Sequence, residues 1–295
     1  MKKNNKIKAS PSRIIFQIIN YIFLGFFALI CFLPLVNLGA ISFSNPSFAE
    51  GGQIGLVPKG FTIDSYRFIF SNNDFFRALG NSIVLLLIGV PFMMVMSLLC
   101  AYPLSRPKSE FKGRNIYIVI LWVCILFSGG IVPEYMLKCA LKLDNTIWAL
   151  ILPGVNVFNV ILLMNFFKAI PEEIHEAAVI DGAGEIKIMF KLYMPLALPA
   201  VLTTMLFTVV ELWNSYLPGI MYYSTIDKMP LQSYLQSVTI NLMDPNISNL
   251  LKDNQVSTKT IESARLFLSI IPMLVFYFPL QKYFVKGLTL GGVKG

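Results

Sequence analysis

The sequence predicts an all-α integral membrane protein with six transmembrane helices, and three observations support that fold class. Of the 295 residues, 56% are hydrophobic and only 14% are charged, whereas soluble globular domains carry about 25% charged residues. Six apolar windows are each long enough to cross a bilayer as a helix, which takes about 20 residues. The sequence between them leaves no continuous room for a soluble core.

The six predicted spans form one membrane domain over residues 14–285. Several contain proline or glycine, for example Pro34, Pro91 and Gly129. Membrane helices tolerate these residues where neighbouring helices satisfy the freed backbone groups. In chain order the spans cover residues 14–36, 79–102, 116–137, 147–167, 196–220 and 264–285.

Positive charge predicts how the spans are oriented. Lysine and arginine collect on the cytoplasmic side of membrane proteins, most clearly in short loops. With the amino terminus inside, most of the 24 lysine and arginine residues fall on that side, several of them in the short loop 103–115. Both termini are then cytoplasmic. Residues 1–13, 168–194 and 286–295 lie inside, and the loops 37–78 and 221–262 lie outside.

The residue types exclude several classes of function. The net charge of +8 follows from cytoplasmic basic residues, so we expect no nucleic-acid partner. Four cysteines without metal-binding spacing and a single histidine, His175, predict no metal site and no disulfide framework. The chain has no GxxxxGK[ST] loop for ATP, and no nucleophile or metal constellation that would predict catalytic residues.

Residues 168–194 form the most polar stretch in the middle of the chain, and they predict two short helices joined by a turn. Pro171 suits a first helical turn, and the acidic pair Glu172–Glu173 favours the positive end of the helix dipole. The glycines of "DGAG" end this helix, and Asp181 is predicted to cap the second one. The second helix, "EIKIMFKLYM", is amphipathic. His175 is predicted to be solvated or to contact a partner.

Composition alone leaves open whether this stretch only lies on lipid. A specific motif favours another interpretation: Glu176-Ala177-Ala178 precede Gly182 by three residues, and Leu192-Tyr193-Met194-Pro195 follow it after nine. This pattern resembles the EAA loop of binding-protein-dependent ABC importer permeases, EAA-x3-G-x9-I-x-L-P, with Leu for Ile and Met for Leu. Asp181, Ala183, Phe190 and Pro199 match an extended form of the motif. Together with "WNSYLP" and the tail "KGLTLGGVKG", they resemble the oligosaccharide, maltose-type branch.

The resemblance implies a type I ABC importer permease in the plasma membrane of a prokaryote, a subunit without catalysis or cofactor of its own. ATP and Mg would be bound by a dimer of partner ATPases. The other implied partners are a second, homologous permease, an extracytoplasmic solute-binding protein and a carbohydrate substrate. The ATPase-coupling residues would be Glu176, Ala177, Ala178, Asp181, Gly182 and Ala183, and a tail contact would come from Gly291, Gly292 and Lys294.

Polar residues inside two predicted spans are candidates for the substrate path. An acidic side chain such as Glu211 is costly in a membrane and often functional, but it could equally pair with a polar neighbour. The asparagines could bind sugar hydroxyls or hold helices together. The candidates are Asn156, Asn159, Glu211, Trp213 and Asn214. The alternatives to a carbohydrate importer are an ABC importer permease for a non-sugar solute, or a secondary transporter.

Overall fold

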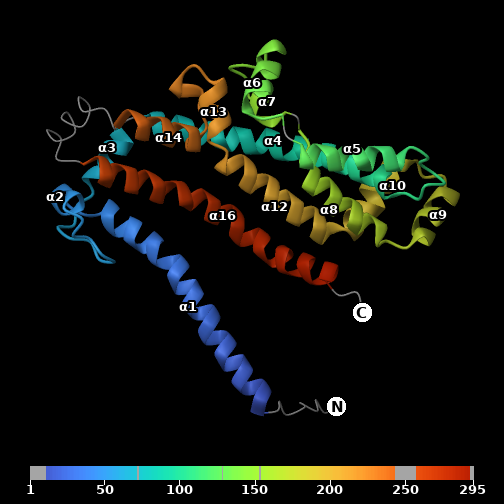
Figure 1. Ribbon diagram of the computed structural model, residues 1–295, viewed down its shortest axis with the longest axis horizontal. Coiled ribbons are helices and arrows are strands. Elements are labelled where there is room, and N and C mark those ends of the chain that lie inside the picture. The colour runs from blue at the N-terminus through green and yellow to red at the C-terminus, as the bar shows by residue number, and fades with distance from the viewer. Residues whose placement is uncertain (1–10, 72, 128, 153, 243–256, 293–295) are drawn as a thin grey trace. The chain divides into compact units, whose positions relative to one another are not determined.

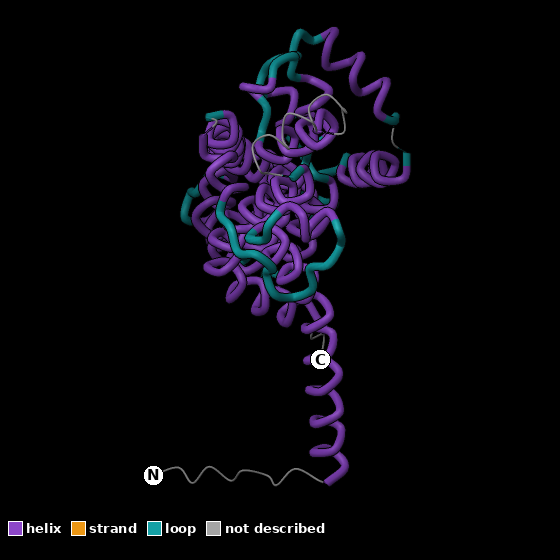
Figure 2. Tube along the Cα trace, turned by 90° about the vertical axis from the view of Figure 1, so that its left-hand side faces the viewer, coloured by secondary structure: helices purple, strands orange, loops and turns teal. Residues whose placement is uncertain are grey.

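The computed structural model describes residues 11–71, 73–127, 129–152, 154–242 and 257–292, and within these ranges the chain is built of helices and connecting turns, with no strand (Figures 1 and 2). It divides into two compact units. Unit 1 comprises the described parts of Met1–Ser71 and Leu242–Leu268, and unit 2 those of Asn72–Asn241 and Ser269–Gly295. The helix α16 (Thr258–Gly292) contributes to both.

Unit 1 contains α1 (Pro11–Ser42), α2 (Pro46–Glu50) and α3 (Asp64–Ser71). The apolar side chains of α1 are exposed over its first 25 residues, as expected of a helix that meets lipid or other helices. Its carboxyl end is held by polar contacts: Asn37 donates to the carbonyl of Gly55 at 2.6 Å, and Ser42 Oγ lies 2.7 Å from the Tyr66 hydroxyl. The following segment therefore folds back onto the end of α1.

The core of unit 2 is a set of three mutually packed helices, α4 (Asp74–Ser105), α8 (Val157–Lys168) and α12 (Leu198–Asn214). Several of their buried polar groups form hydrogen bonds inside the bundle, since a membrane interior supplies no water. Thr204 and Thr208 bond carbonyls of the preceding turn, and Asn159 Nδ2 donates to Thr208 Oγ1 at 3.1 Å.

Three of the predicted spans are interrupted. The window 196–220 becomes α12 and then α13 (Leu217–Tyr222), with a break at residues 215–216. The window 116–137 becomes α5 (Arg114–Leu126) and α6 (Ile131–Ala140), separated at Gly130, whose φ of +82° favours glycine. The window 147–167 becomes α7 (Trp148–Ile151) followed by α8.

By length and composition, two described helices, α1 and α4, could each cross a membrane alone, and the total reaches four if each of two bent helix pairs is one span. The number of six spans therefore stays a prediction.

The predicted outer loop 221–262 is more ordered than its polar composition indicated. After α13 (Leu217–Tyr222) comes a 3₁₀ turn (Ile226–Lys228), and then α14 (Leu231–Leu242). The turn is tied to α4, since Asn81 Nδ2 donates to the Asp227 carbonyl at 2.8 Å and the Leu231 amide donates to Ser82 Oγ at 2.7 Å. Residues 243–256 of this loop lie outside the described residues.

Close approach of α4 to α12 depends on Gly89, and this yields a prediction. A Cβ at Gly89 would lie 2.8 Å from Leu212 Cδ1 and 3.3 Å from Ile151 Cγ1, whereas a Cβ at Gly80 of the same helix meets nothing within 4 Å. We expect Gly89→Leu to destabilise the purified chain by about 1–3 kcal/mol through overpacking. The matched control Gly80→Leu should stay within about 0.5 kcal/mol of the parent. Thermal unfolding in detergent measures both, and equal melting temperatures for the two variants would contradict the packing argument.

Candidate functional site

The polar stretch forms an elbow at one end of unit 2, as Figure 1 shows. We use "the elbow" for residues 171–196. It comprises α9 (Glu172–Ile180), a turn, α10 (Glu185–Ile188), a π-helical turn (Met189–Tyr193) and α11 (Met194–Leu196). The segment Glu185–Leu196 meets α12 at 90°. The elbow thus continues through the backbone into a core helix of the unit.

The turn of the elbow is a Schellman motif, in which the chain leaves a helix through a left-handed residue. Gly182 has a φ of +73°, its amide donates to the Val179 carbonyl, and the Ala183 amide donates to the Ala178 carbonyl, both at 3.0 Å. Asp181 is the C-cap residue of α9.

The prediction that Asp181 caps the second helix is wrong. That position belongs to Gly184, which makes no side-chain cap.

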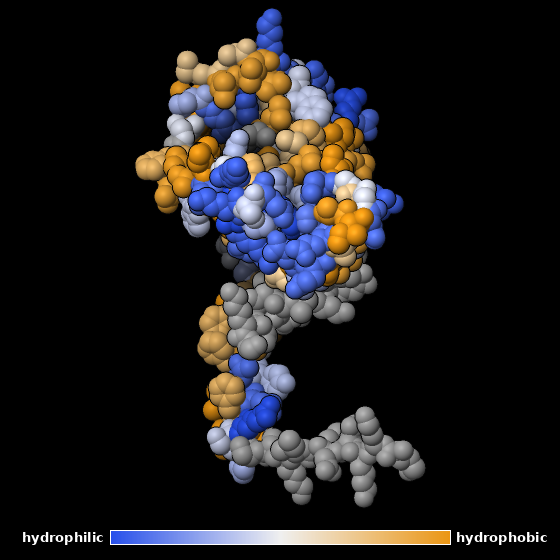
Figure 3. Space-filling model, turned by 90° about the vertical axis from the view of Figure 1, so that its right-hand side faces the viewer, coloured by the Kyte–Doolittle hydropathy of each residue, from blue (hydrophilic) through white to orange (hydrophobic). Residues whose placement is uncertain are grey.

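The outer surface of the elbow carries the predicted coupling residues. Glu176, Ala177, Asp181 and Gly182 are exposed, Ala183 is half-buried and Ala178 is buried. Beside them, Val179 and Ile180 are 48% and 85% exposed. Figure 3 shows hydrophilic residues gathered over this end of unit 2, with apolar residues next to them. An isoleucine this exposed at a helix end was not among the predicted site residues, although its place beside the motif was a usable signal.

The inner surface of the elbow is an aromatic cluster centred on Tyr193, which is 1% exposed. Its ring centroid lies 5.1 Å from that of Tyr102 on α4 and 5.8 Å from that of Phe167 on α8. His175 packs against it and is also buried. The prediction of a solvated or partner-contacting His175 is therefore wrong, because this side chain of α9 faces Tyr193 and is buried there.

Arg106 anchors the same cluster from the loop after α4. Its guanidinium donates to the Tyr193 hydroxyl at 2.6 Å and to both carboxylate oxygens of Glu110 at 2.7 and 2.8 Å. These hydrogen bonds hold the pKa of Glu110 below its usual value. In the sequence Arg106 counted only as a cytoplasmic positive charge, and its role as an anchor carried no sequence signal.

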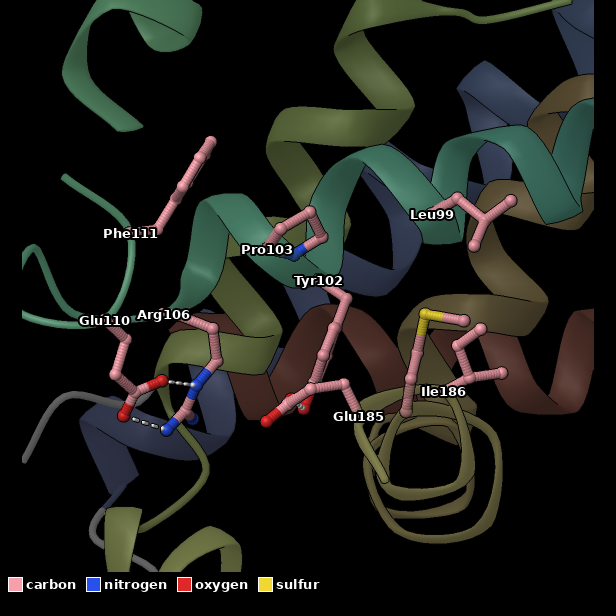
Figure 4. A pocket seen from close by; sticks show the side chains of 9 residues that line it. Leu99, Tyr102, Pro103, Arg106, Glu110, Phe111, Glu185 and Ile186 are labelled. Carbon is pink, nitrogen blue, oxygen red and sulfur yellow. Dashed lines mark hydrogen bonds and ion pairs between the residues drawn. The ribbon is translucent and has the colours of Figure 1, made fainter. Parts of the chain in front are cut away.

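A cavity of about 390 Å³ separates α4 from α10 beside this cluster (Figure 4). Leu99, Tyr102 and Pro103 line it from α4, and Glu185, Ile186 and Met189 from the elbow. At its wall, Glu185 Oε2 accepts a hydrogen bond from the Tyr102 hydroxyl at 2.6 Å and lies 3.3 Å from His175 Nε2.

Two of the predicted path residues come together on the exposed side of the α8–α12 pair. Asn156 Nδ2 donates to Glu211 Oε2 at 2.8 Å, while Asn156 Oδ1 accepts from the backbone amide of Phe158 at 3.0 Å and so caps α8. Glu211 and Asn214 are exposed. Beside this pair, Phe158 is 59% exposed and its ring centroid lies 6.0 Å from that of Phe207. The aromatic pair was not predicted.

Two other candidates for the substrate path, Asn159 and Trp213, are buried. They are 1% and 3% exposed, and Asn159 bonds Thr208 between α8 and α12. Both side chains pack inside unit 2. The sequence could not distinguish the buried face of α12 from its exposed face, and the assignment of these two residues to the substrate path stays a prediction.

The other predicted sites are only partly described. Gly291 and Gly292 are the last residues of α16, and Lys294 lies outside the described residues. Among the described residues, no group of three or more His, Cys, Asp or Glu side chains is placed to hold a metal ion.

Comparison with known proteins places these features in a family. The profile of the binding-protein-dependent transport system inner membrane component matches residues 57–289. The polygalacturonan/rhamnogalacturonan transport system permease protein YtcP of Bacillus subtilis (strain 168) is 38% identical over 284 residues, covering 95% of this chain and 99% of YtcP. Protein LplC of the same organism is 36% identical, covering 95% of each.

A solved structure has the same architecture. It is that of a bacterial ABC transporter involved in the import of the acidic polysaccharide alginate, with 31% identity, a TM-score of 0.83, and coverage of 95% of this chain and 100% of that one. The present chain belongs to the family of binding-protein-dependent transport system inner membrane components and is a permease of the ABC importer type.

Proposed function

We propose that this chain is the transmembrane permease subunit of an ATP-driven importer for a carbohydrate, most simply an oligosaccharide delivered by an extracytoplasmic solute-binding protein. The transport of polygalacturonan and rhamnogalacturonan named for YtcP, and of alginate for the solved transporter, supports a saccharide. The family description itself supports a binding protein as partner.

The observation that carries the proposal is the elbow. The end of α9 and the turn after it, which we call the tip, carry Ile180, which is 85% exposed, while the other side of the elbow is the buried aromatic cluster around Tyr193. Exposed apolar side chains surrounded by polar ones are typical of a protein–protein contact. The partner there would be one subunit of an ATPase dimer, on the cytoplasmic side of the plasma membrane, with both termini of this chain on that side. ATP and Mg would bind to the ATPases, so this subunit needs no cofactor and catalyses no reaction.

The mechanism that follows is alternating access. Closure of the ATPases draws together the elbows of this chain and of a second, homologous permease, and the attached helices rotate as nearly rigid bodies. Nucleotide can drive this change only by binding one state more tightly than the other. The elbow transmits that preference to the membrane helices. The tail residues Gly291, Gly292 and Lys294 would add a second contact to the ATPases.

Ile180 tests whether the tip docks on an ATPase. Replacing it with aspartate puts a charge into the proposed apolar contact, and we expect roughly a tenfold or greater loss of ATPase association, the scale of an interface anchor worth more than about 1.4 kcal/mol. Copurification from membranes measures the association. The control is Leu141→Asp, at a 60%-exposed leucine outside the elbow. An Ile180→Asp chain that keeps its ATPase as well as the control does would refute docking at the tip.

Gly182 tests the shape of the turn. An L-residue with a φ of +73° costs about 1–2 kcal/mol, so Gly182→Ala should distort the Schellman turn and reduce transport while the complex stays assembled. Gly184→Ala is the matched control, because Gly184 has a φ of −74° and a Cβ there meets nothing within 4 Å. Solute uptake and ATP hydrolysis in proteoliposomes give the readout. Equal uptake by the two variants would count against the proposed role of the turn.

The candidate path residues that are not buried are Asn156, Glu211 and Asn214, and we add the exposed Phe158 to them. An aromatic face beside a carboxylate and an amide suits a sugar ring and its hydroxyls, since these supply apolar contact and hydrogen-bond acceptors and donors together.

Glu211→Ala should lower saccharide uptake by roughly tenfold or more, the effect of losing a hydrogen bond to a charged group. Uptake of labelled oligosaccharides measures it, with Asp144→Ala, at an exposed acidic residue of unit 2 outside the α8–α12 pair, as the control. Unchanged saccharide uptake would exclude Glu211 from the path. If the assembled complex carried only a non-sugar solute, that alternative importer would replace the carbohydrate proposal, and uptake without any ATPase would indicate a secondary transporter.

A further inference from the structure

The backbone between α10 and α12 is not a regular α-helix. It passes through the π-helical turn Met189–Tyr193 and then through Ala197, whose φ of −93° and ψ of 18° depart from helical values. Such interruptions are sites at which a helix can bend. A displacement of α9 could be absorbed by bending at these positions. Side-chain contacts are therefore needed if the core helices are to move together with α9.

One carboxylate oxygen supplies such a contact by linking three helices. Glu185 Oε2, at the start of α10, accepts from the Tyr102 hydroxyl of α4 at 2.6 Å and lies 3.3 Å from His175 Nε2 of α9. Because an ionised carboxylate only accepts hydrogen bonds, the His175 Nε2 atom is the donor. Tyr102 and His175 are both about 95% buried, so their polar atoms depend on this partner.

The ring of Tyr193 also packs on Tyr102, but it does so from the π-helical turn and not from α10. The cavity of about 390 Å³ lies between α4 and α10, so Leu99 and Ile186 face open space across it. Figure 4 shows Tyr102 and Glu185 meeting at the wall of the cavity. The hydrogen bond from Tyr102 to Glu185 therefore bridges α4 and the first residue of α10 at the edge of this cavity.

We infer that Glu185 is a positioning residue that fixes the elbow to α4, so that displacement of α9 moves α4 and α12 as one body. The inference rests on the proposed function, because it concerns how ATPase movement reaches the membrane helices. The hydrogen bond to Tyr102 connects the elbow to α4, whereas the backbone through Ala197 connects the elbow to α12.

The first test compares ATP hydrolysed per solute transported in the complete importer, reconstituted in proteoliposomes. Glu185→Ala should raise this ratio roughly tenfold, the weight of a lost hydrogen bond to a charged group, with assembly unchanged. Glu185→Gln should restore it, since its amide oxygen can accept from both partners. Lys187→Ala, at an exposed residue of the same helix, is the control. Tyr102→Phe combined with Glu185→Ala should be no worse than Glu185→Ala alone, because both remove one link.

The second test bridges the cavity covalently. In a chain whose Cys31, Cys100, Cys124 and Cys139 are replaced by serine, Leu99→Cys and Ile186→Cys are joined with a short bismaleimide. If α4 and α10 move as one body, the bridge leaves transport intact and rescues the Glu185→Ala variant.

Three results would overturn the inference: a bridge that blocks transport, an unchanged ratio for Glu185→Ala, or failure of Glu185→Gln to restore it. Each differs from failure of the proposed function, in which the unmodified chain itself would neither bind an ATPase nor transport.

Discussion

Burial of Tyr193 is the interaction on which the arrangement of the elbow depends. This side chain comes from the π-helical turn and contacts Tyr102, Phe167 and His175, while its hydroxyl accepts from Arg106. An aromatic ring contributes a large apolar area, and its hydroxyl needs a partner when buried. Tyr193 satisfies both requirements at the meeting point of α4, α8 and α9. These contacts of Tyr193 fix the exposed end of the elbow to the core helices of unit 2.

The membrane imposes a second constraint, which shapes the core of unit 2. Backbone and side-chain polar groups in a bilayer have no water to bind, so they must be satisfied internally. The threonines of α12 bond carbonyls of their own helix, and Asn159 bonds Thr208 between helices. Small residues at Gly89 and Ser97 let the helices approach closely enough for these contacts. Polar pairing and close packing therefore support each other.

The sequence predicted the helical class, the elbow and its turn, because these follow from local chemistry: apolar windows, acidic residues at a helix start, and a glycine where the chain reverses. It could not predict which side of each helix is buried. His175 and Glu211 carry equally polar side chains, yet one is buried against Tyr193 and the other faces outward. Arg106 and Tyr102 are similar cases, since their partners Tyr193 and Glu185 are more than eighty positions away. Breaks such as that before α8 also depend on packing that a hydropathy window cannot detect.

Asn156 both caps helix α8 and donates a hydrogen bond to Glu211. Its side-chain oxygen accepts a hydrogen bond from a backbone amide at the start of α8, and its NH₂ group donates a hydrogen bond to one carboxylate oxygen of Glu211. Aspartate would preserve the first contact but place like charges side by side, and alanine would lose both. Any substitution of Asn156 therefore alters the start of α8 and the surroundings of Glu211 together.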